Sequence, residues 1–228
     1  MAKDGRQARW DKHNQQRRQQ ILDAALVVIE AGRPGDEFHV QQIAVRAGLN
    51  RTVVYRHFDD RADLDRAIRA HVLDDLTAVL IPTVSLDGTI RQIIRRIVGS
   101  YVEWVAAHPA AHTFAVQEIS GPFEQGTDRI AGALVDVLRR ALRLVDADLD
   151  DDERLLLDPL AHVLVGAVFG AVRHWVAQEP REPEAARLVG MLSLSVWSLI
   201  DGHARRIGLE LDPDRPIGEL FATEGATP

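Results

Sequence analysis

The pattern of apolar and polar positions is helical along nearly the whole chain. Between residues 14 and 31, apolar side chains recur every three or four residues and form one stripe, made of Ile21, Ala24, Ala25, Val28 and Ile29. No alternating apolar and polar run bounded by hairpin turns is found in the sequence. The sequence therefore predicts an all-α protein whose first helix covers residues 14–31.

Glycine, proline and acidic runs divide the rest of the chain into further helices. The predicted helices cover residues 40–47, 51–58, 59–81, 89–107, 109–118, 128–145 and 184–207. The stretch "SGPFEQG", residues 120–126, is expected to be a loop. Another helix follows the acidic run "DADLDDDE", and Pro159 is expected to kink or restart it with Asp158 as a cap.

Residues 51–58 separate into two sides on a helical wheel drawn at about 100° per residue. One side, an arc of about 140°, carries Arg51, Thr52, Tyr55 and Arg56. The opposite side carries Val54, His57 and Phe58, so His57 is expected to pack inward rather than to bind a partner. One face of this predicted helix is therefore basic and hydroxyl-bearing, and the other is suited to a core.

The residues before this helix predict a tight turn. Gly48 suits the left-handed conformation that ends a helix, and Asn50 can cap the next helix by accepting a backbone N–H. A short helix, such a turn and a second helix with a basic face are typical of a helix-turn-helix. An ordinary helical hairpin with a solvated basic face would give the same local pattern.

The charge distribution changes the picture that the composition gives. The chain has 228 residues, 46% of them hydrophobic, and a net charge of −7. Residues 1–58 hold ten Lys or Arg and six Asp or Glu, so this part carries +4 and the remainder −11. This asymmetry favours a head that faces a polyanion on an acidic body, although chance clustering would also produce it.

Several classes of site and location are excluded or disfavoured. The absence of cysteine rules out disulfides, thiolate zinc sites and thiol nucleophiles. The N-terminal residues lack the apolar core of a secretory signal, and the longest apolar run, residues 163–172, falls short of the roughly 18 residues of a membrane span. A cytoplasmic protein without a membrane partner is therefore expected.

The segment "IAVRAGLNRTVVYRHFDDRADL", preceded by "ILDAALVVIEAG", resembles the DNA-binding head of the TetR family of bacterial transcriptional regulators. The matching features are Ile43-Ala44, Ala47-Gly48, a small polar residue at position 50, Tyr55 and His57-Phe58, with Arg61 where the family usually has lysine. The resemblance covers about residues 14–75, and the rest matches only in helix number and length.

This resemblance implies a sequence-specific DNA-binding regulator and not an enzyme. It implies a repressor that a small, hydrophobic ligand releases from a palindromic operator. The implied organisation is a basic arm over residues 1–13, disordered or reaching the minor groove. The arm is followed by a helix-turn-helix domain over residues 14–60, a ligand-binding and dimerisation domain over 61–208, and a tail over 209–228.

The resemblance also implies which residues meet double-stranded DNA. Arg51 and Thr52 would face base edges, and Arg56 would face bases or the backbone. The remaining expected contacts, chiefly to phosphates, are His39, Gln41, Asn50, Tyr55 and Arg61. Thr52-Val53 stands where the family often has Gly-Thr, and the loop before His39 is about two residues longer than usual, so individual contacts are expected to differ.

The body is expected to bind the ligand among its middle helices. Tyr101 and Trp104 share one helix face, and aromatic and polar side chains elsewhere can converge with them, although they can equally fill a core. The predicted pocket residues are Tyr101, Trp104, His108, Phe114, Gln117, His162, Phe169 and Trp175.

Two helices of the body are apolar around most of their circumference, which predicts a homodimer. Gly166 and Gly170 permit close approach of a partner. The predicted interface is Gly166, Gly170, Met191, Leu192, Ser195, Val196 and Leu199. Two heads on a two-fold axis would then read a palindrome.

Metals, cofactors and other functions have little support in the sequence. His108 and His112 are spaced for a metal, but Pro109 between them indicates a helix start, and the acidic run lacks calcium-loop spacing. No cofactor is expected. An all-helical enzyme would need a nucleophile–base pair, a Glu-x-x-His motif or a phosphate loop, and none is found in the sequence. A helical adaptor that binds only protein would not need the basic face of residues 51–58.

Overall fold

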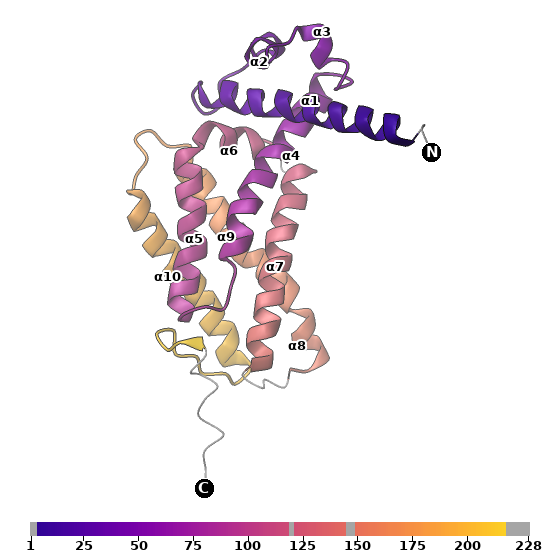
Figure 1. Ribbon diagram of the computed structural model, residues 1–228. Coiled ribbons are helices and arrows are strands. Elements are labelled where there is room, and N and C mark those ends of the chain that lie inside the picture. Colours follow the sequence, from indigo (N-terminus) through magenta and orange to yellow (C-terminus); the bar gives the residue numbers. More distant parts are fainter. Residues whose placement is uncertain (1–3, 119–120, 145–148, 218–228) are drawn as a thin grey trace. The chain divides into compact units, whose positions relative to one another are not determined.

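The computed structural model describes residues 4–118, 121–144 and 149–217, with side chains from Lys12 onward (Figure 1). The helices are α1 (Asp4–Glu30), α2 (Val40–Arg46), α3 (Arg51–Val54), α4 (Arg61–Leu80), η1 (Ile81–Thr83), α5 (Ile90–Ala107), α6 (Pro109–Ala115), α7 (Pro122–Leu144), α8 (Asp151–Leu155), α9 (Leu157–Val176) and α10 (Ala185–Arg206). Within these ranges no β-strand occurs, only one antiparallel bridge between Thr89 and Pro216. The all-α prediction is confirmed.

The chain divides into two compact units. Unit 1 comprises residues 1–74 and 108–123, and unit 2 comprises residues 75–107 and 124–228. The boundary falls inside α4, and α6 belongs to unit 1 although it lies between two helices of unit 2 in the sequence.

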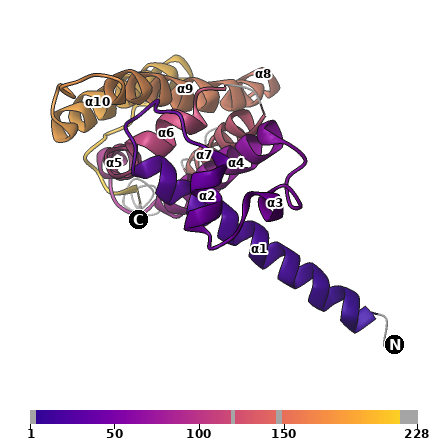
Figure 2. The same cartoon turned by 90° about the horizontal axis from the view of Figure 1, so that it is seen from above.

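Unit 1 is built around the apolar stripe of α1. Helix α1 packs against α2 and α6, and α2 packs against α3 (Figure 2). Ile21 and Ala25 of the stripe are fully buried, as are Ile43 of α2 and Val54 of α3. The predicted stripe is therefore the core against which the short helices are held.

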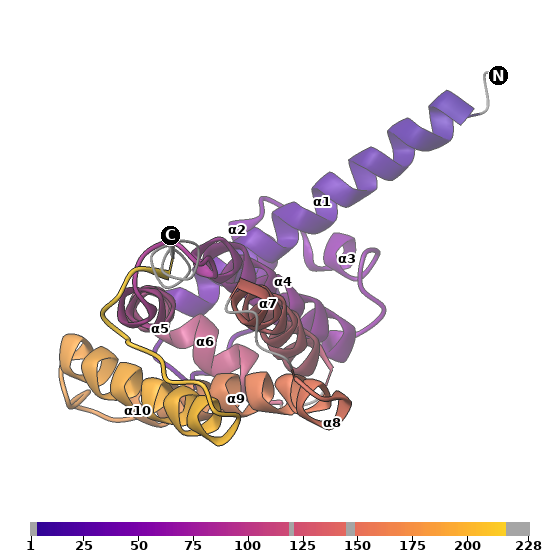
Figure 3. The same ribbon diagram turned by 90° about the horizontal axis from the view of Figure 1, so that it is seen from below.

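Unit 2 contains the long helices of the body. Helix α10 packs along α5, and both contact α9, whose start is adjoined by α8 (Figures 1 and 3). Val102 and Val105 of α5 and Ala161 and Val172 of α9 are fully buried. This unit also contains a cavity, described below.

Two helices, α1 and α7, begin well before the positions that the sequence predicts. Helix α1 begins at Asp4, ten residues before the predicted start, because the residues that precede its apolar stripe are rich in Gln and Arg, which favour helix. Helix α7 begins at Pro122, so the predicted loop over 120–126 is wrong beyond Gly121. Proline is well accommodated in a first helical turn, where its missing N–H needs no partner.

The break before α9 lies three residues before Pro159. Helix α8 ends at Leu155 and α9 restarts at Leu157, which confirms the predicted restart. The cap position is Leu156, so the prediction that Asp158 caps this helix is wrong. Pro159 lies in the first turn of α9, where its ring and missing N–H are tolerated.

Helices α8 and α9 form an unusually apolar stretch. By length and composition alone, residues Asp151–Val176 would suffice to cross a membrane, a test that core helices also pass. Only 33% of the most apolar window is buried within the chain. Part of the apolar surface of α9 is therefore left uncovered by the single chain.

Candidate nucleic-acid interface and ligand cavity

The connection between α2 and α3 has a defined geometry. Gly48 has a φ of 67°, the left-handed conformation, and the N–H of Leu49 donates to the Ala44 carbonyl at 2.8 Å. The N–H of Gly48 donates to Val45 at 3.1 Å, which completes a Schellman motif. Asn50 then caps α3, since its Oδ1 accepts the Val53 N–H at 3.0 Å. Both predictions about this turn are confirmed, and the turn fixes the angle between the helices.

The two sides of α3 differ in exposure as the wheel indicates. Val54 and Phe58 are buried, whereas Arg51, Thr52 and Arg56 are exposed. Tyr55 is half-buried, and the guanidinium carbon of Arg51 lies 5.4 Å from the centre of its ring. The exposed side presents guanidinium and hydroxyl donors of the kind that base edges and phosphates accept.

Helix α3 is shorter than predicted. Its regular part ends at Val54, and residues 55–58 continue as turns. The N–H groups of Arg56 and His57 donate to carbonyls three residues earlier, at Val53 and Val54. The tighter bonding ends the regular α-helix at Val54, while Arg56, like Arg51, stays exposed.

The start of α2 also lies at the surface of unit 1. His39 and Gln41 are both exposed, and His39 is the cap residue. The His39 backbone N–H donates to Gln42 Oε1 at 2.7 Å. This bond orders the start of α2 and leaves the side chains of His39 and Gln41 directed away from the core.

Arg61 is engaged within unit 1. Its Nε lies 2.8 and 2.9 Å from the two Asp65 carboxylate oxygens, and its Nη1 donates to the Phe38 carbonyl at 3.0 Å. Its guanidinium also lies 4.5 Å from the centre of the Phe38 ring. These contacts leave Nη2 as the nitrogen through which Arg61 would reach a phosphate.

Helix α1 holds the end of the α3 region from the side. Arg18 Nη1 donates to the His57 carbonyl at 2.7 Å, and its guanidinium lies 4.2 Å from the centre of the Phe58 ring. Burial lowers the pKa of the half-buried His57, and the nearby cations Arg17 and Arg18 lower it further. His57 is thereby favoured in its neutral form, which suits a packing residue.

Unit 2 encloses a cavity of about 540 Å³. Its walls are mostly aliphatic and come from α5, α7, α9 and α10, the loop before α5 and the segment after α10. Tyr101 and Phe169 contribute the two aromatic rings, stacked with centres 4.4 Å apart and planes 23° apart. Burial raises the pKa of the Tyr101 phenol well above its ordinary value, so this hydroxyl is neutral.

The structure brings only part of the predicted pocket together. Tyr101 and Phe169 line the cavity, whereas His108, Phe114 and Gln117 belong to unit 1. Phe114 packs edge-on against Phe38 with ring centres 5.2 Å apart.

The other three predicted pocket residues belong to unit 2 but do not line its cavity. Trp175 is buried, and its Nε1 donates to the Pro183 carbonyl at 2.8 Å. His162 is exposed and contacts Asp128 and Asp158. Trp104 is half-buried. Aromatic type alone is therefore a poor guide to the cavity.

Most of the cavity residues that sequence reasoning missed are aliphatic. Ile90, Ile94 and Ile97 of α5 and Leu134 and Leu138 of α7 line the cavity at helical spacing. The same spacing marks any buried stripe, so periodicity could have indicated that these positions face inward. It carries no signal that separates a cavity wall from a filled core.

The predicted dimer residues fall into two groups. Gly166, Gly170, Met191 and Ser195 are exposed, and a Cβ added at either glycine would meet no atom within 4 Å. Leu192 and Val196 are only 4% and 9% exposed and face the interior of unit 2, and Leu199 is half-buried. Leu192 and Val196 lie one helix step away from Met191 and Ser195, which turns them inward.

The exposed apolar face continues beyond the predicted residues. Val163 of α9 is 52% exposed, and Met191 and Leu194 of α10 are 49% and 60% exposed. Since α9 and α10 contact each other, these side chains belong to neighbouring helices of one unit (Figure 3).

No grouping of three or more His, Cys, Asp or Glu residues spaced for a metal ion occurs in the part of the chain that the structure describes. His108 and His112 lie at the start of α6 and one turn into it. The Ala111 N–H donates to Glu30 Oε1 at 2.9 Å, so the start of α6 is held by the end of α1.

Comparison with known protein sequences gives related regulators. The profile described as "Bacterial regulatory proteins, tetR family" matches residues 21–68. An uncharacterized HTH-type transcriptional regulator of Mycobacterium tuberculosis is 30% identical over 203 residues, which cover 87% of this chain and 83% of that protein. The HTH-type transcriptional repressor LfrR of Mycolicibacterium smegmatis is 33% identical over 130 residues, covering 54% and 64%.

Solved structures resemble the fold. A tetR-family transcriptional regulator from Streptomyces coelicolor superposes with a TM-score of 0.64 at 22% identity, covering 90% of this chain and 97% of that one. RolR, solved in complex with the ligand resorcinol, superposes with a TM-score of 0.57 at 15% identity, covering 86% and 96%. At these identities the likeness concerns the fold alone.

Proposed function

This chain belongs to the TetR family of bacterial regulatory proteins and is a DNA-binding transcriptional regulator, and from this premise we propose that it is a repressor released from a palindromic operator by a small apolar ligand. The observation that carries the DNA-binding part is the α2–turn–α3 unit, where a Schellman motif and the Asn50 cap fix the helices and leave one basic face of α3 exposed.

The proposed contacts follow from the exposed groups. Arg51 and Thr52 read base edges in the major groove, and Arg56 contacts either a base or the backbone. Tyr55, His39 and Gln41 hold phosphates, and Asn50 contributes through its amide nitrogen because its Oδ1 caps α3. Arg61 supports this surface from Phe38 and Asp65 and reaches a phosphate through Nη2.

The contact face is tested on DNA obtained by in vitro selection from a random library. Arg51→Ala combined with Tyr55→Phe removes a base contact and a phosphate contact, so binding measured by fluorescence anisotropy should weaken at least about tenfold. Arg95→Ala, an exposed arginine on α5, is the matched control. Unchanged affinity of the double variant, with its dimer intact, would refute the proposed face.

A homodimer is proposed because a partner chain would bury the exposed apolar face of α9 and α10. Val163, Met191 and Leu194 project from this face, and Gly166 and Gly170 leave room for a partner helix. A second copy of the chain, related by a two-fold axis, would bury the same face and place two heads for a palindrome.

The dimer is tested with exposed rather than buried positions. Val163→Glu with Leu194→Glu places two charges in the proposed interface and should give monomers in light scattering after size exclusion. Val27→Glu, at a comparably exposed apolar position of α1, should remain dimeric. A double variant that stays dimeric would place the interface elsewhere. Leu192 and Val196 are unsuitable here because they are buried within the subunit.

The repressor and effector assignments are supported by relatives and by the cavity. LfrR is named a repressor, and RolR was solved with resorcinol bound. A ligand in the unit 2 cavity would act by favouring a state with lower operator affinity, since a ligand shifts an equilibrium only by binding its states differently. Native mass spectrometry of freshly purified protein would detect a retained ligand. An effector that strengthens operator binding would contradict the proposed release.

The proposed location of the protein is the cytoplasm, where the operator lies.

A further inference from the structure

The cavity of unit 2 is elongated along the helices. It is lined from Ile90 to Tyr101 on α5, from Ile130 to Leu142 on α7 and from Leu157 to Phe169 on α9. At a rise of about 1.5 Å per residue, each of these stretches is roughly 16–18 Å long. A ligand that fills the cavity therefore lies parallel to the helices.

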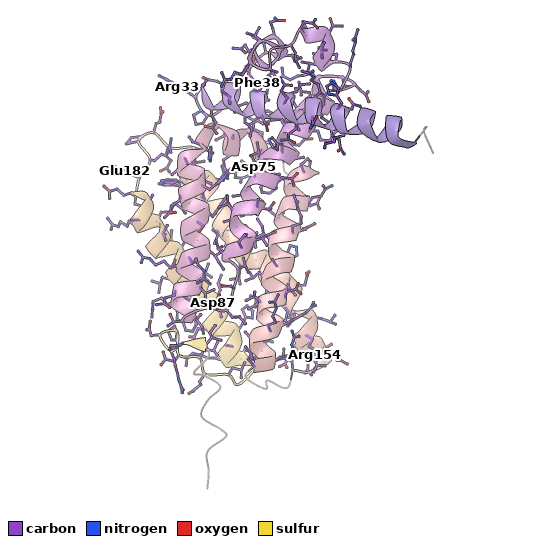
Figure 4. The ribbon with its side chains drawn as sticks, in the orientation of Figure 1. Arg33, Phe38, Asp75, Asp87, Arg154 and Glu182 are labelled. Atoms are coloured by element: carbon purple, nitrogen blue, oxygen red, sulfur yellow. The ribbon has the colours of Figure 1, made fainter. Side chains whose placement is uncertain are left out.

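The two ends of the cavity differ in chemistry. The deep end holds the stacked rings of Tyr101 and Phe169 among aliphatic side chains. The other end lies where α5 and α9 begin and α10 ends, and the bridge between Thr89 and Pro216 joins two of these segments there. Figure 4 labels Asp87, just before α5, and Arg154 of α8 at this end.

All charged side chains that line the cavity lie at that second end. They are Asp150, Asp152, Glu153, His203 and Arg206. Asp150 and Glu153 are occupied by each other's backbone N–H groups, at 2.7 and 3.1 Å. The side chains of Asp152, His203 and Arg206 are exposed, and none of them forms a hydrogen bond or an ion pair with any residue that the structure describes.

The unoccupied polar groups complement one kind of head group. A carboxylate at Asp152 accepts hydrogen bonds, and the guanidinium of Arg206 donates them. A head group that both donates and accepts, such as a hydroxyl, can bond to either of these charged groups. The long aliphatic walls can satisfy only a hydrocarbon body.

We propose that the effector is an elongated amphiphile whose hydrocarbon body lies along α5, α7 and α9 and whose hydrogen-bonding head lies among Asp152, His203 and Arg206. This inference rests on the proposed function, which assigns the cavity to an effector. The deep end, at Tyr101 and Phe169, sets the longest body that fits.

The chain-length dependence is tested by calorimetric titration of the full-length protein with linear alcohols from 1-hexanol to 1-dodecanol. Affinity should rise about fourfold per added methylene until the body reaches the deep end. The compact alcohol 1-adamantanol, with the same number of carbons as 1-decanol, should bind more weakly than 1-decanol. Equal affinity of these two alcohols, or affinity independent of chain length, would overturn the proposal.

The orientation is tested with one substitution at each end. Val168→Phe, beside Phe169, should weaken 1-dodecanol much more than 1-hexanol, because only the longer body reaches that depth. Ala141→Phe, near the polar end on α7, should weaken the binding of both alcohols. If the Ala141→Phe protein unfolds, Leu142→Trp is used in its place. Equal weakening of the two alcohols by Val168→Phe would overturn the orientation.

The same titrations separate the ligand class from the regulatory role. Operator affinity is measured for each variant with and without 1-dodecanol. Chain-length-dependent binding that leaves operator affinity unchanged supports the ligand class and contradicts effector-driven release. The absence of alcohol binding in a protein that still binds its operator contradicts the ligand class and leaves DNA recognition standing.

Discussion

At the scale of single residues, the helix-turn-helix depends on one backbone conformation. Gly48 adopts a φ of 67°, and a Cβ added there would meet no atom within 4 Å. Any effect of alanine at this position therefore comes from the strain of the left-handed conformation and not from a clash. The sequence pattern places glycine where the turn needs it.

We expect Gly48→Ala to lower the free energy of unfolding by about 1–2 kcal/mol, the cost of the left-handed conformation for a residue with a Cβ. Gly132→Ala is the control, since Gly132 lies within α7 without a positive φ and also has open space around it. Alanine there should stabilise by about 0.5–1 kcal/mol. Urea unfolding measures both, and changes of the same sign would contradict this account.

His162 shows how one residue makes stability depend on pH. Its Nδ1 lies 2.9 Å from the Asp158 carbonyl oxygen and its Nε2 lies 3.3 Å from an Asp128 carboxylate oxygen. The hydrogen bond to the Asp158 backbone, followed by the contact with Asp128, raises the pKa of His162 above its ordinary value. The folded state therefore binds this proton more tightly than the unfolded state does.

The stabilisation from His162 should be complete below about pH 6.5, the unfolded value, and should be lost as the pH rises through the raised folded pKa. The difference in unfolding free energy between the wild type and His162→Gln should thus shrink with rising pH. Urea unfolding at several pH values measures it, with His203→Gln as the control. A difference in unfolding free energy that grows with pH would contradict the raised pKa of His162.

At the scale of elements, the segment after α10 closes one end of unit 2. The Ile217 N–H donates to the Gly88 carbonyl, and the Arg91 N–H donates to the Pro213 carbonyl, both at 3.0 Å. The Arg91 guanidinium also meets the Asp214 carboxylate through two contacts of 2.7 and 3.0 Å. This ion pair is exposed to solvent, so its expected contribution to stability is small.

Arg91→Glu should turn this attraction into repulsion and speed hydrogen exchange of the Ile217 amide a few-fold, since that amide is protected by the bond to Gly88. The double variant Arg91→Glu with Asp214→Arg should restore protection. Arg95→Glu makes the same charge change one turn away. Exchange that rises equally in Arg95→Glu would assign the effect to net charge.

At the scale of the whole molecule, the homodimer that we propose would make recognition depend on pairing of two chains as well as on the face of α3. One head offers few contacts, and a two-fold dimer doubles each of them on a palindrome. In such a dimer, every substitution in the contact face would be present twice in the complex. The relatives that show the family are transcriptional regulators and not enzymes. The family therefore also confirms the prediction that the chain is not an enzyme.

This doubling separates the two roles left open for Arg56. If Arg56 contacts phosphates, Arg56→Ala should reduce the slope of log affinity against log salt by about two units, since each neutralised phosphate contributes about 0.9. If it contacts a base, affinity should fall with a smaller change in slope. Tyr55→Phe removes no charge and should leave the slope unchanged; a changed slope there would undermine this distinction.

The sequence by itself determined the helices, the turn at Gly48 and the exposed side of α3. These features depend on residues close together in the chain, such as Asn50 and the Val53 N–H that it caps. Helix limits were less well predicted where strong helix formers extend a helix, as in α1, or where turns tighten, as after Val54.

Only the tertiary structure decided which apolar positions line the cavity and which remain exposed. Leu134 lines the cavity, Leu192 is buried and Leu194 is exposed, yet all three are leucines in apolar helices. Phe114 packs on Phe38 rather than in the cavity, a contact between residues far apart in the chain. Periodicity shows which side of a helix is apolar, but what covers that side depends on partners that local pattern does not specify.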